Sequence, residues 1–467
     1  MTVETSHKPA PSESDVNCSP RRRAWAARHL DAATKALLDE DSRYFLRQSV
    51  STPCLNAIRK AEGIWIEDLA GRRYMDFHGN NVHHIGYGHP RLKEAIRQQM
   101  DALPFAPRRF ACGPAVALAR KLASLAPGGL TKMLLAPGGS EAIEIALKIA
   151  RAATGRHKTL SFWDAFHGAG FGAASVGGEA LFRSGAIGPL LPGSVHVPPF
   201  ACYRNPLGPG HSSREPHDER CNIFASLVSY ALEKEGDIGA VIAEPLRAVP
   251  YLSPPGFWRA VRAACDRHGA LLIFDEIPTG LGKTGRLFAC EHDGVAPDIL
   301  VIGKALGGGI LPVAATICRP ELDVGGDYAF GHYTHEKNPV LARAALATLE
   351  IIEDEGLVEN AAKVGAQALA RLAAMMDRHP LIGDVRGRGL LLGIELVRDR
   401  ATKTPASDAA EAVLYGALER GLSFKTTMGN VLTLTPPLTI TAAEMDKALD
   451  IIEACLTEVE AMAKAKG

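Results

Sequence analysis

The stretch LLIFDEIPTGLGKTGRLFACEHDGVAPDILVIGKALGGG, residues 271–309, contains two short apolar runs that each lead to a charged residue. The run LLIF is followed by Asp275, and the run ILVI is followed by Gly303 and Lys304. Short, continuously apolar strands are typical of a parallel sheet that is covered on both faces. Because one excursion of the chain separates the two runs, Asp275 and Lys304 can reach one crevice at the carboxyl edge of that sheet.

Further apolar runs lie on both sides of this stretch and alternate with longer helical patterns. They occur at residues 132–136, 159–163, 240–244 and 313–318, and the clearest helical pattern covers residues 140–153. This alternation predicts an α/β fold with a parallel sheet. A long amphipathic region at 338–376, two strand-rich segments and a last helix then predict a smaller α+β part, with which a β-hairpin at 57–77 is expected to pack.

The composition excludes several classes of protein. Lysine plus arginine and aspartate plus glutamate are balanced at 52 each in 467 residues, so no overall charge favours nucleic acid or an anionic membrane. The nine cysteines include no CxxC pair, which argues against a disulfide scaffold or a zinc ribbon and favours the reducing cytoplasm. No apolar run approaches the length of a membrane span. The polar, Pro/Ser-rich start of the chain predicts a disordered or partner-draped tail.

Polar or aromatic residues follow each predicted strand of the sheet. Gly138, Gly139 and Ser140 open a helix, where backbone N–H groups and the helix dipole favour a phosphate. Phe166 and His167 follow the next strand, and Glu244 follows the strand after it. Taken singly, these residues also fit a helix cap, a core aromatic or a salt bridge. Taken together with Asp275 and Lys304, they fit a phosphorylated pyridine aldehyde, whose ring nitrogen the aspartate keeps protonated and whose aldehyde the lysine binds.

Two other patterns suggest ligands but fail on spacing. GLGKTG at 280–285 looks like a phosphate loop, but a Walker A motif needs a glycine at position 277, which is isoleucine. The histidines show no metal-ligand spacing, and neither His83–His84 nor His332 and His335 have a cysteine or carboxylate set beside them. We therefore expect no metal site.

The stretch 271–309 resembles the signature of the class III aminotransferases, which are fold type I enzymes that use pyridoxal 5′-phosphate (PLP); the resemblance extends from about residue 51 to the C-terminus. It implies a large domain with a mostly parallel seven-stranded sheet, a smaller α+β domain, and a homodimer with shared active sites. The implied divisions are an N-terminal arm (1–45), a segment packing with the small domain (46–90), a PLP-binding domain (91–335) and a small domain (336–467).

The same resemblance assigns roles to individual residues. Lys304 becomes the Schiff-base lysine and Asp275 the partner of the pyridinium nitrogen. The other implied cofactor contacts are the phosphate ligands Gly139 and Ser140, the ring-stacking Phe166 with the adjoining His167, Glu244 beside the ring, and Thr334, which reaches the phosphate in the neighbouring subunit.

Three departures from the family pattern bear on the reaction. The family commonly has an arginine before the PPL motif that can grip a substrate carboxylate, and here that position is Thr433, which argues against an amino acid substrate unless another arginine serves. NNVHHIGYGHP at 80–90 resembles instead a lyase branch of the family. In that branch an arginine like Arg109 can hold a phosphoryl group, although a surface arginine is the alternative.

These departures predict a PLP-dependent lyase that acts on a short β-hydroxy amino-phosphonate in phosphonate catabolism and releases ammonia. Asn81, His84 and Arg109 are the candidate substrate residues. Two alternatives remain open: an ω-aminotransferase that passes the amino group to a keto acid, and a lyase that eliminates phosphate from a phosphoethanolamine-type substrate.

Overall fold

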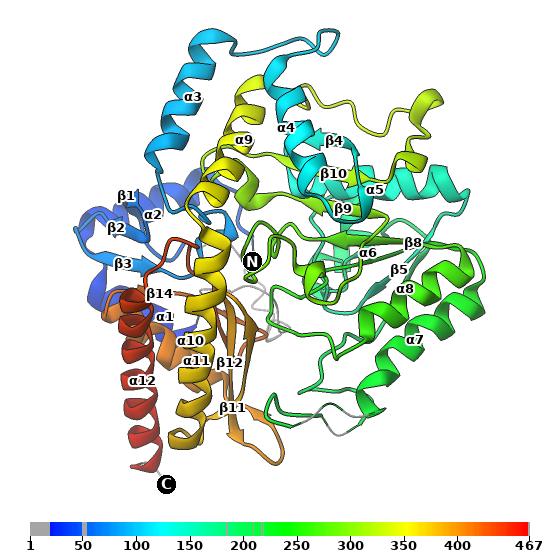
Figure 1. Cartoon of the computed structure of the whole chain (residues 1–467). Coiled ribbons are helices and arrows are strands. Elements are labelled where there is room, and N and C mark those ends of the chain that lie inside the picture. Colours follow the sequence, from blue (N-terminus) through cyan, green and yellow to red (C-terminus); the bar gives the residue numbers. More distant parts are fainter. Residues whose placement is uncertain are drawn as a thin grey trace.

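A seven-stranded sheet lies in the right half of the view in Figure 1. The computed structural model describes residues 19–48, 54–183, 185–208, 210–215, 217 and 219–465. The strand order is β4-β10-β9-β8-β7-β5-β6. In that order the strands are β4 (Lys132–Ala136), β10 (Ala314–Cys318), β9 (Ile299–Ile302), β8 (Leu271–Asp275), β7 (Ile238–Ala243), β5 (Lys158–Phe162) and β6 (Ser194–Val197). Only β10 runs against its neighbours, so the mostly parallel sheet predicted from the sequence is confirmed.

Both faces of the sheet are buried, which explains why its strands are continuously apolar. In β8, Leu272 and Phe274 join one core cluster with Trp258, which belongs to α8 (Phe257–His268). The alternate residue Ile273 joins a second cluster with Ile145, which belongs to α5 (Gly139–Thr154). Because successive side chains of a strand point to opposite faces, α5 and α8 cover opposite faces of the sheet.

The remaining helices of this part flank the sheet or pack on one another. They are α3 (Pro90–Ala102), α4 (Gly113–Leu125), α6 (Phe171–Val176), α7 (Glu219–Glu235) and α9 (Pro339–Asp354). Helix α7 packs on α8, and both α3 and α4 pack on α9. Helix α9 also contacts the short helix η6 (Lys304–Gly307), so this layer supports the segment that carries Lys304.

Two smaller sheets lie in the second part of the molecule, and the first of them joins N-terminal strands to a C-terminal strand. One has the order β1-β2-β3-β14 and the other the order β11-β12-β16-β15, with β13 paired to β12. Their strands are β1 (Ile58–Glu62), β2 (Trp65–Asp68), β3 (Arg73–Asp76), β14 (Leu422–Ser423), β11 (Ile382–Arg388), β12 (Leu391–Asp399), β13 (Thr404–Pro405), β15 (Lys425–Thr427) and β16 (Val431–Leu434). The expected hairpin is a three-stranded meander, and its last strand β3 pairs in parallel with β14, about 350 residues later in the chain.

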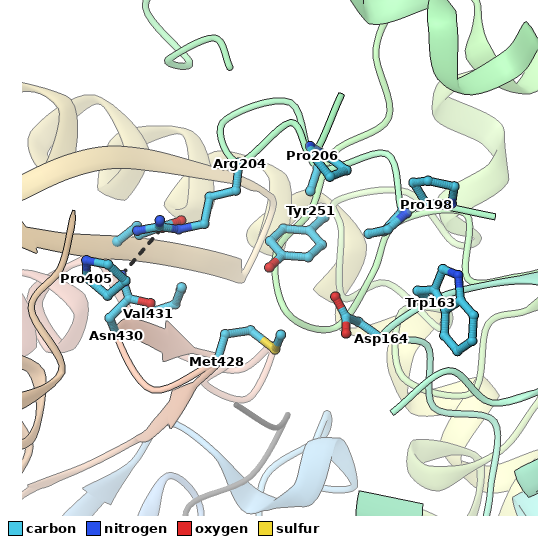
Figure 2. Close-up of a pocket in the computed structure, with 13 residues that line it drawn as sticks. Trp163, Asp164, Pro198, Arg204, Pro206, Tyr251, Pro405, Met428, Asn430 and Val431 are labelled. Atoms are coloured by element: carbon cyan, nitrogen blue, oxygen red, sulfur yellow. Dashed lines mark hydrogen bonds and ion pairs between the residues drawn. The ribbon is translucent and has the colours of Figure 1, made fainter. Parts of the chain in front are cut away.

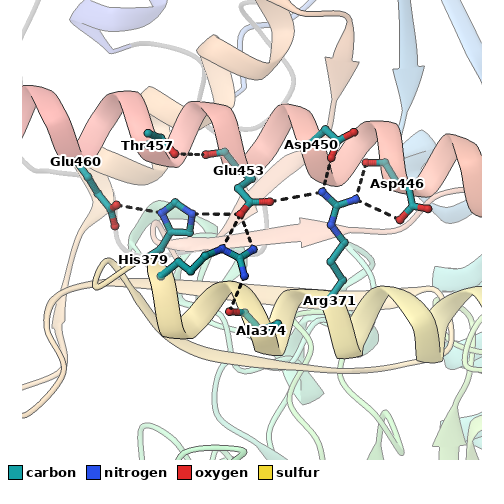
Figure 3. A network of polar contacts seen from close by, with 9 residues as sticks. Arg371, Ala374, His379, Asp446, Asp450, Glu453, Thr457 and Glu460 are labelled. Carbon is teal, nitrogen blue, oxygen red and sulfur yellow. Dashed lines mark hydrogen bonds and ion pairs between the residues drawn. The ribbon is translucent and has the colours of Figure 1, made fainter.

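Two long helices cover the C-terminal part, namely α10 (Leu357–Arg378) and α12 (Ala442–Lys464), beside α11 (Ser407–Glu419). The single helical region expected at 338–376 is divided between α9 and α10 at Gly356, whose φ of 60° ends one helix and starts the next. Ion pairs join α10 to α12 (Figure 3): Arg371 contacts Asp446 and Asp450, while Arg378 contacts Glu453.

The N-terminal arm contains two helices, α1 (Pro20–His29) and α2 (Ala32–Tyr44). Arg22 is buried in this arm, and its guanidinium donates to the carbonyl oxygens of Cys54 and Leu55. The polar tail expected at residues 1–18 lies outside the described residues. Among the helices that the structure describes, none combines the length and apolar character needed to cross a membrane.

Candidate functional site

The carboxyl edge of the sheet brings together residues that are far apart in the sequence. Strands β9, β8, β7 and β5 are adjacent and parallel, so their carboxyl ends lie side by side. Lys304 follows β9, Asp275 ends β8, Glu244 follows β7, and His167 lies in the loop after β5. Ligands of open α/β sheets bind outside this edge, so the four residues are placed where a ligand is expected.

Asp275 and His167 form a buried pair at this edge. The Nδ1 atom of His167 lies 2.8 Å from Oδ2 of Asp275, and both side chains are almost wholly excluded from solvent. The other carboxylate oxygen of Asp275 accepts a hydrogen bond from the backbone N–H of Ile277 at 3.0 Å. These two contacts fix the orientation of the carboxylate. The second ring nitrogen of His167, Nε2, is buried without a protein partner among the described residues, which leaves a polar atom for a ligand to satisfy.

Lys304 has a strained backbone in a tightly packed glycine segment. Its φ is 46°, in the left-handed region that residues with a Cβ seldom adopt. The neighbouring Gly308 has a φ of 65°, and a Cβ there would lie 2.2 Å from Leu92 and 2.8 Å from the hydroxyl of Thr348. The glycines therefore allow the segment to pack against buried side chains. Strain of this kind persists where the surrounding structure imposes it, as at functional sites.

The predicted phosphate turn faces the same cavity as Lys304. This cavity has a volume of about 370 Å³, and its lining includes Gly138, Gly139, Val82 and Lys304. Ser140, in the first turn of α5, accepts a hydrogen bond from the backbone N–H of Ala169 at 3.1 Å. The free N–H groups at the start of α5 and its dipole favour an anion here.

Ile277 is a site residue that the sequence reasoning missed. A Cβ on Gly139 would lie 2.9 Å from its Cδ1 atom, and a Cβ on Gly303 would lie 3.5 Å from its Cγ2 atom. Its side chain therefore lies between the phosphate turn and the lysine segment. The only signal in the sequence is its position two residues after Asp275, since an isoleucine at the end of a strand otherwise indicates core.

The remaining predicted cofactor residues are Phe166, Glu244 and Thr334. Phe166 is half-buried in the loop after β5, and its ring packs on Phe182 with centroids 4.6 Å apart. Glu244 is buried, and its Oε2 atom accepts a hydrogen bond from the backbone N–H of Ala248 at 2.8 Å. Thr334 is exposed in the segment before α9.

Asn81 and His84 lie close to the lysine segment, because the turn η1 (Gly79–Asn81) packs against η6. Asn81 is buried, and its side-chain oxygen lacks a hydrogen-bond partner among the described residues. The Nε2 atom of His84 lies 3.3 Å from the carbonyl oxygen of Gly280. Burial, and then the Lys283 ammonium, lower the pKa of His84 well below its usual value, so its imidazole is neutral at neutral pH.

Arg109 does not join these residues within one chain. It is exposed in the turn that Pro107 and Phe110 close. The adjacent Arg108 donates to Nε2 of His332 at 2.7 Å, and the rings of Phe105 and His335 meet edge to face. The Arg109 turn and the Thr334 segment therefore lie side by side on the surface.

A second cavity lies near the loop after β5 (Figure 2). Its volume is about 400 Å³, and its lining includes Asp164, Arg204, Tyr251 and Met428. Arg204 is already paired with the buried carboxylate of Glu395, so its charge is compensated.

Thr433 occupies the position at which the family commonly has an arginine. Thr433 is fully buried in β16, and its hydroxyl lies 2.8 Å from that of Thr427. On the adjacent strand β15 the residue in register with Thr433 is the buried Lys425, so a lysine lies beside this position but no arginine fork is present to grip a substrate carboxylate.

The donor set fits PLP. A helix N-terminus with two glycines suits the phosphate, a lysine suits the aldehyde, and a fixed carboxylate suits a protonated ring nitrogen. The buried, unpartnered nitrogen of His167 beside that carboxylate is consistent with a polar ligand at the same place.

Comparisons with known proteins agree with this assignment. A family model described as "Aminotransferase class-III" matches residues 47–456. The (R)-1-hydroxy-2-aminoethylphosphonate ammonia-lyase of Vibrio splendidus is 47% identical over 457 residues, which cover 96% of this chain and 95% of that protein.

Solved structures of related enzymes have the same fold. An (S)-enantioselective ω-transaminase from Thermomicrobium roseum superposes with a TM-score of 0.84 and 33% identity, covering 92% of this chain and 99% of that one. An amine transaminase from an uncultivated Pseudomonas species, in its PLP-bound form, gives a TM-score of 0.79 and 32% identity over 86% and 95% of the two chains. The protein is therefore a member of the class III aminotransferase family, and its cofactor is pyridoxal 5′-phosphate.

Proposed function

We propose that the protein is an ammonia-lyase that converts (R)-1-hydroxy-2-aminoethylphosphonate to phosphonoacetaldehyde and ammonia. The observation that carries the proposal is the 47% identity to an enzyme of that name over almost the whole of both chains. The substrate loses water across its two carbons, and the resulting enamine tautomerises and takes up water. The net change is therefore the release of ammonia and the formation of an aldehyde.

The absence of an arginine at Thr433 supports a substrate without an α-carboxylate. Thr433 bonds to Thr427 and is in register with Lys425, and Arg204 is paired with Glu395, so neither position supplies an uncompensated guanidinium. A bidentate arginine is the usual protein partner of a carboxylate. The site therefore favours a small amine substrate whose anionic group binds away from the Thr433 position.

Lys304 is the residue we assign to proton transfer. When bound, PLP supplies an aldehyde for the substrate amine and a ring that withdraws electrons from the adjacent carbon. The Nζ atom of Lys304 would remove the proton from the carbon that bears nitrogen. The same ammonium would then give a proton to the departing hydroxyl on the neighbouring carbon. His84 is held neutral by burial, so it would position the substrate rather than act as a cationic acid.

Other residues would hold the cofactor. Asp275, oriented by His167, would keep the ring nitrogen protonated. Gly139 and Ser140 would hold the phosphate, Phe166 and Ile277 would contact the ring, and Glu244 would lie beside it. The buried oxygen of Asn81 would contact the substrate.

Thr334 and Arg109 would act across the interface of a homodimer. Both residues are exposed, and the Arg108–His332 hydrogen bond joins their two segments into one surface. In a homodimer this surface would place Thr334 at the phosphate in the neighbouring subunit. Arg109 would bring a guanidinium to the phosphonate, for which the Thr433 position supplies no arginine.

An ω-aminotransferase is the second candidate, because solved structures with that activity superpose over more than nine tenths of the chain. The two functions differ in what the enzyme requires. A transaminase needs a keto acid to accept the amino group, whereas a lyase releases ammonia without one.

The decisive experiment supplies the hydroxylated aminoethylphosphonate and phosphoethanolamine separately, without a keto acid, and measures ammonia and inorganic phosphate. We expect ammonia without phosphate from the first substrate. Lys304→Ala is the matched inactive control and should lower the rate by about 10²–10⁴-fold. Strict dependence on pyruvate would identify a transaminase instead, and phosphate release from phosphoethanolamine would identify a phospho-lyase; either result overturns the proposal.

A further inference from the structure

Three side chains that bind soft metal ions meet at the crossover between β6 and α7. The ligand atoms of Cys202, His217 and Cys221 all lie within 4.8 Å of one another. The Nδ1 atom of His217 is 3.4 Å from the sulfur of Cys221. In a tetrahedral site with Zn–S and Zn–N bonds of ordinary length, ligand atoms are about 3.3–3.8 Å apart. Movements of the three ligand atoms by less than about 1 Å would therefore let all three contact one ion.

The three ligands come from two separate segments of the chain, so their spacing in the sequence does not reveal the cluster. Cys202 follows β6, His217 lies two residues before α7, and Cys221 lies in the first turn of α7. Cys221 is buried, Cys202 is half-buried and His217 is exposed, so solvent can reach the cluster from one side. Since no CxxC or paired-histidine pattern is present, the sequence predicted no metal site.

A small cavity adjoins the cluster and supplies room for a fourth ligand. Its volume is about 120 Å³, and its lining includes Cys202, His211 and His217. The backbone N–H of His211 donates to the carbonyl oxygen of Cys202 at 2.9 Å, which keeps this second histidine close. A cavity of this size holds water, and water is a common fourth ligand beside three protein ligands.

We propose that Cys202, His217 and Cys221 form a zinc site whose fourth position opens to this cavity. Two sulfurs and one imidazole suit Zn²⁺, while Mg²⁺ and Ca²⁺ prefer oxygen ligands and iron–sulfur clusters use four cysteines. Binding of zinc would displace the thiol protons of Cys202 and Cys221.

The ion would fix a loop that is attached to the C-terminal sheets. Within residues 203–217, Arg204 pairs with Glu395 of β12, and the backbone N–H of Ser213 donates to Asp384 of β11 at 2.7 Å. Arg204 also lines the cavity beside Asp164. By joining the two ends of this loop, zinc would hold one wall of that cavity in place. The role is structural, because none of the three ligands lines the cavity that contains Lys304.

The test measures zinc in the full-length, PLP-loaded protein, purified without a polyhistidine tag and in the presence of a reductant. We expect about one zinc per chain by mass spectrometry of the metals after gel filtration. Cys202→Ser and Cys221→Ser should lower zinc content at least about tenfold, and His217→Ala should weaken zinc binding by about 10–100-fold. Cys318→Ser, a buried cysteine on β10, is the matched control and should retain the metal.

X-ray absorption at the zinc edge of the unsubstituted protein makes the result independent of how well the variants fold. It should detect two sulfur ligands at about 2.3 Å with nitrogen or oxygen at about 2.0–2.1 Å. Three outcomes would overturn the proposal: no bound zinc after incubation with the metal, a zinc content in both cysteine variants equal to that of the unsubstituted protein, or a Cys202–Cys221 disulfide as the persistent state after purification. Because none of these measurements uses activity, they leave the proposed function unaffected.

Discussion

The contact between His167 and Asp275 joins the loop after β5 to the end of β8, about a hundred residues later in the sequence. The Nδ1–H of His167 donates to one carboxylate oxygen of Asp275 over 2.8 Å, and the backbone N–H of Ile277 donates to the other. An aspartate that must keep a ring nitrogen protonated works best when its carboxylate cannot rotate. His167 is therefore a positioning residue that acts through Asp275.

We expect His167→Ala to lower kcat by up to about 10²-fold, because a misplacement near 1 Å at a reacting centre has that effect. KM should change little, and the visible absorption of bound PLP should shift. Steady-state kinetics and the absorption spectrum measure both effects. In an Asp275→Asn background the same substitution should have little further effect, since the two residues act as one unit. Additive losses in the double variant would show that His167 acts independently of Asp275.

Helix α12 shows how local sequence sets the boundary of an element. Thr441 accepts a hydrogen bond from the backbone N–H of Glu444 at 3.2 Å, and Glu444 accepts one from the backbone N–H of Thr441 at 2.9 Å. This capping box satisfies two N–H groups that have no partner within the helix. The exposed ion pairs of Arg371 and Arg378 add less, because water and salt screen them.

Thr441→Ala should reduce the free energy of unfolding by about 1 kcal/mol, the usual effect of losing an N-cap hydroxyl. Thr457→Ala is the matched control on the same helix, because the Thr457 hydroxyl bonds only back to the Glu453 carbonyl at 3.0 Å. Alanine is favoured in a helix interior, so that change should be neutral or slightly stabilising. Urea unfolding of both variants measures the difference, and equal midpoints would contradict a role for the cap.

Histidines that are neutral because they are buried or half-buried are a property of the molecule as a whole. Burial is the main cause that lowers the pKa of His78 to about 3 and of His83, His196 and His292 to about 4. An unfolded histidine takes up its proton near pH 6.5. Between about pH 6.5 and pH 4 the unfolded chain therefore binds more protons than the folded chain, and stability falls as the pH falls. Burial acts oppositely on Glu276, raising its pKa to about 7, and it also raises the pKa of Asp293, but these are two groups against five histidines once His84 is included.

We expect the urea midpoint to decrease steadily as the pH is lowered from about 7 to about 5. His292 does not line the cavity that contains Lys304. His292→Gln removes one of these groups, and it should reduce the slope of stability against pH by an amount equal to at most about one bound proton. Unfolding curves at constant ionic strength measure both quantities. A midpoint that stays constant over this range would contradict the assignment of neutral buried histidines.

The sequence alone determined the strands β5, β7, β8, β9 and β10, because an apolar run buried on both faces is a local pattern. It likewise determined that Asp275 and Lys304 stand at the ends of neighbouring strands. It did not predict β6, whose half-buried residues and His196 lack that apolar run, or the break at Gly356.

Only the tertiary structure decided which distant side chains meet. It paired His167 with Asp275, placed Ile277 between the phosphate turn and Lys304, left Arg109 on the surface, and gathered Cys202, His217 and Cys221. Local patterns report whether a residue is buried and which element it belongs to. Contacts between loops depend instead on how the strands are ordered in the sheet, and that order is a property of the whole packed molecule.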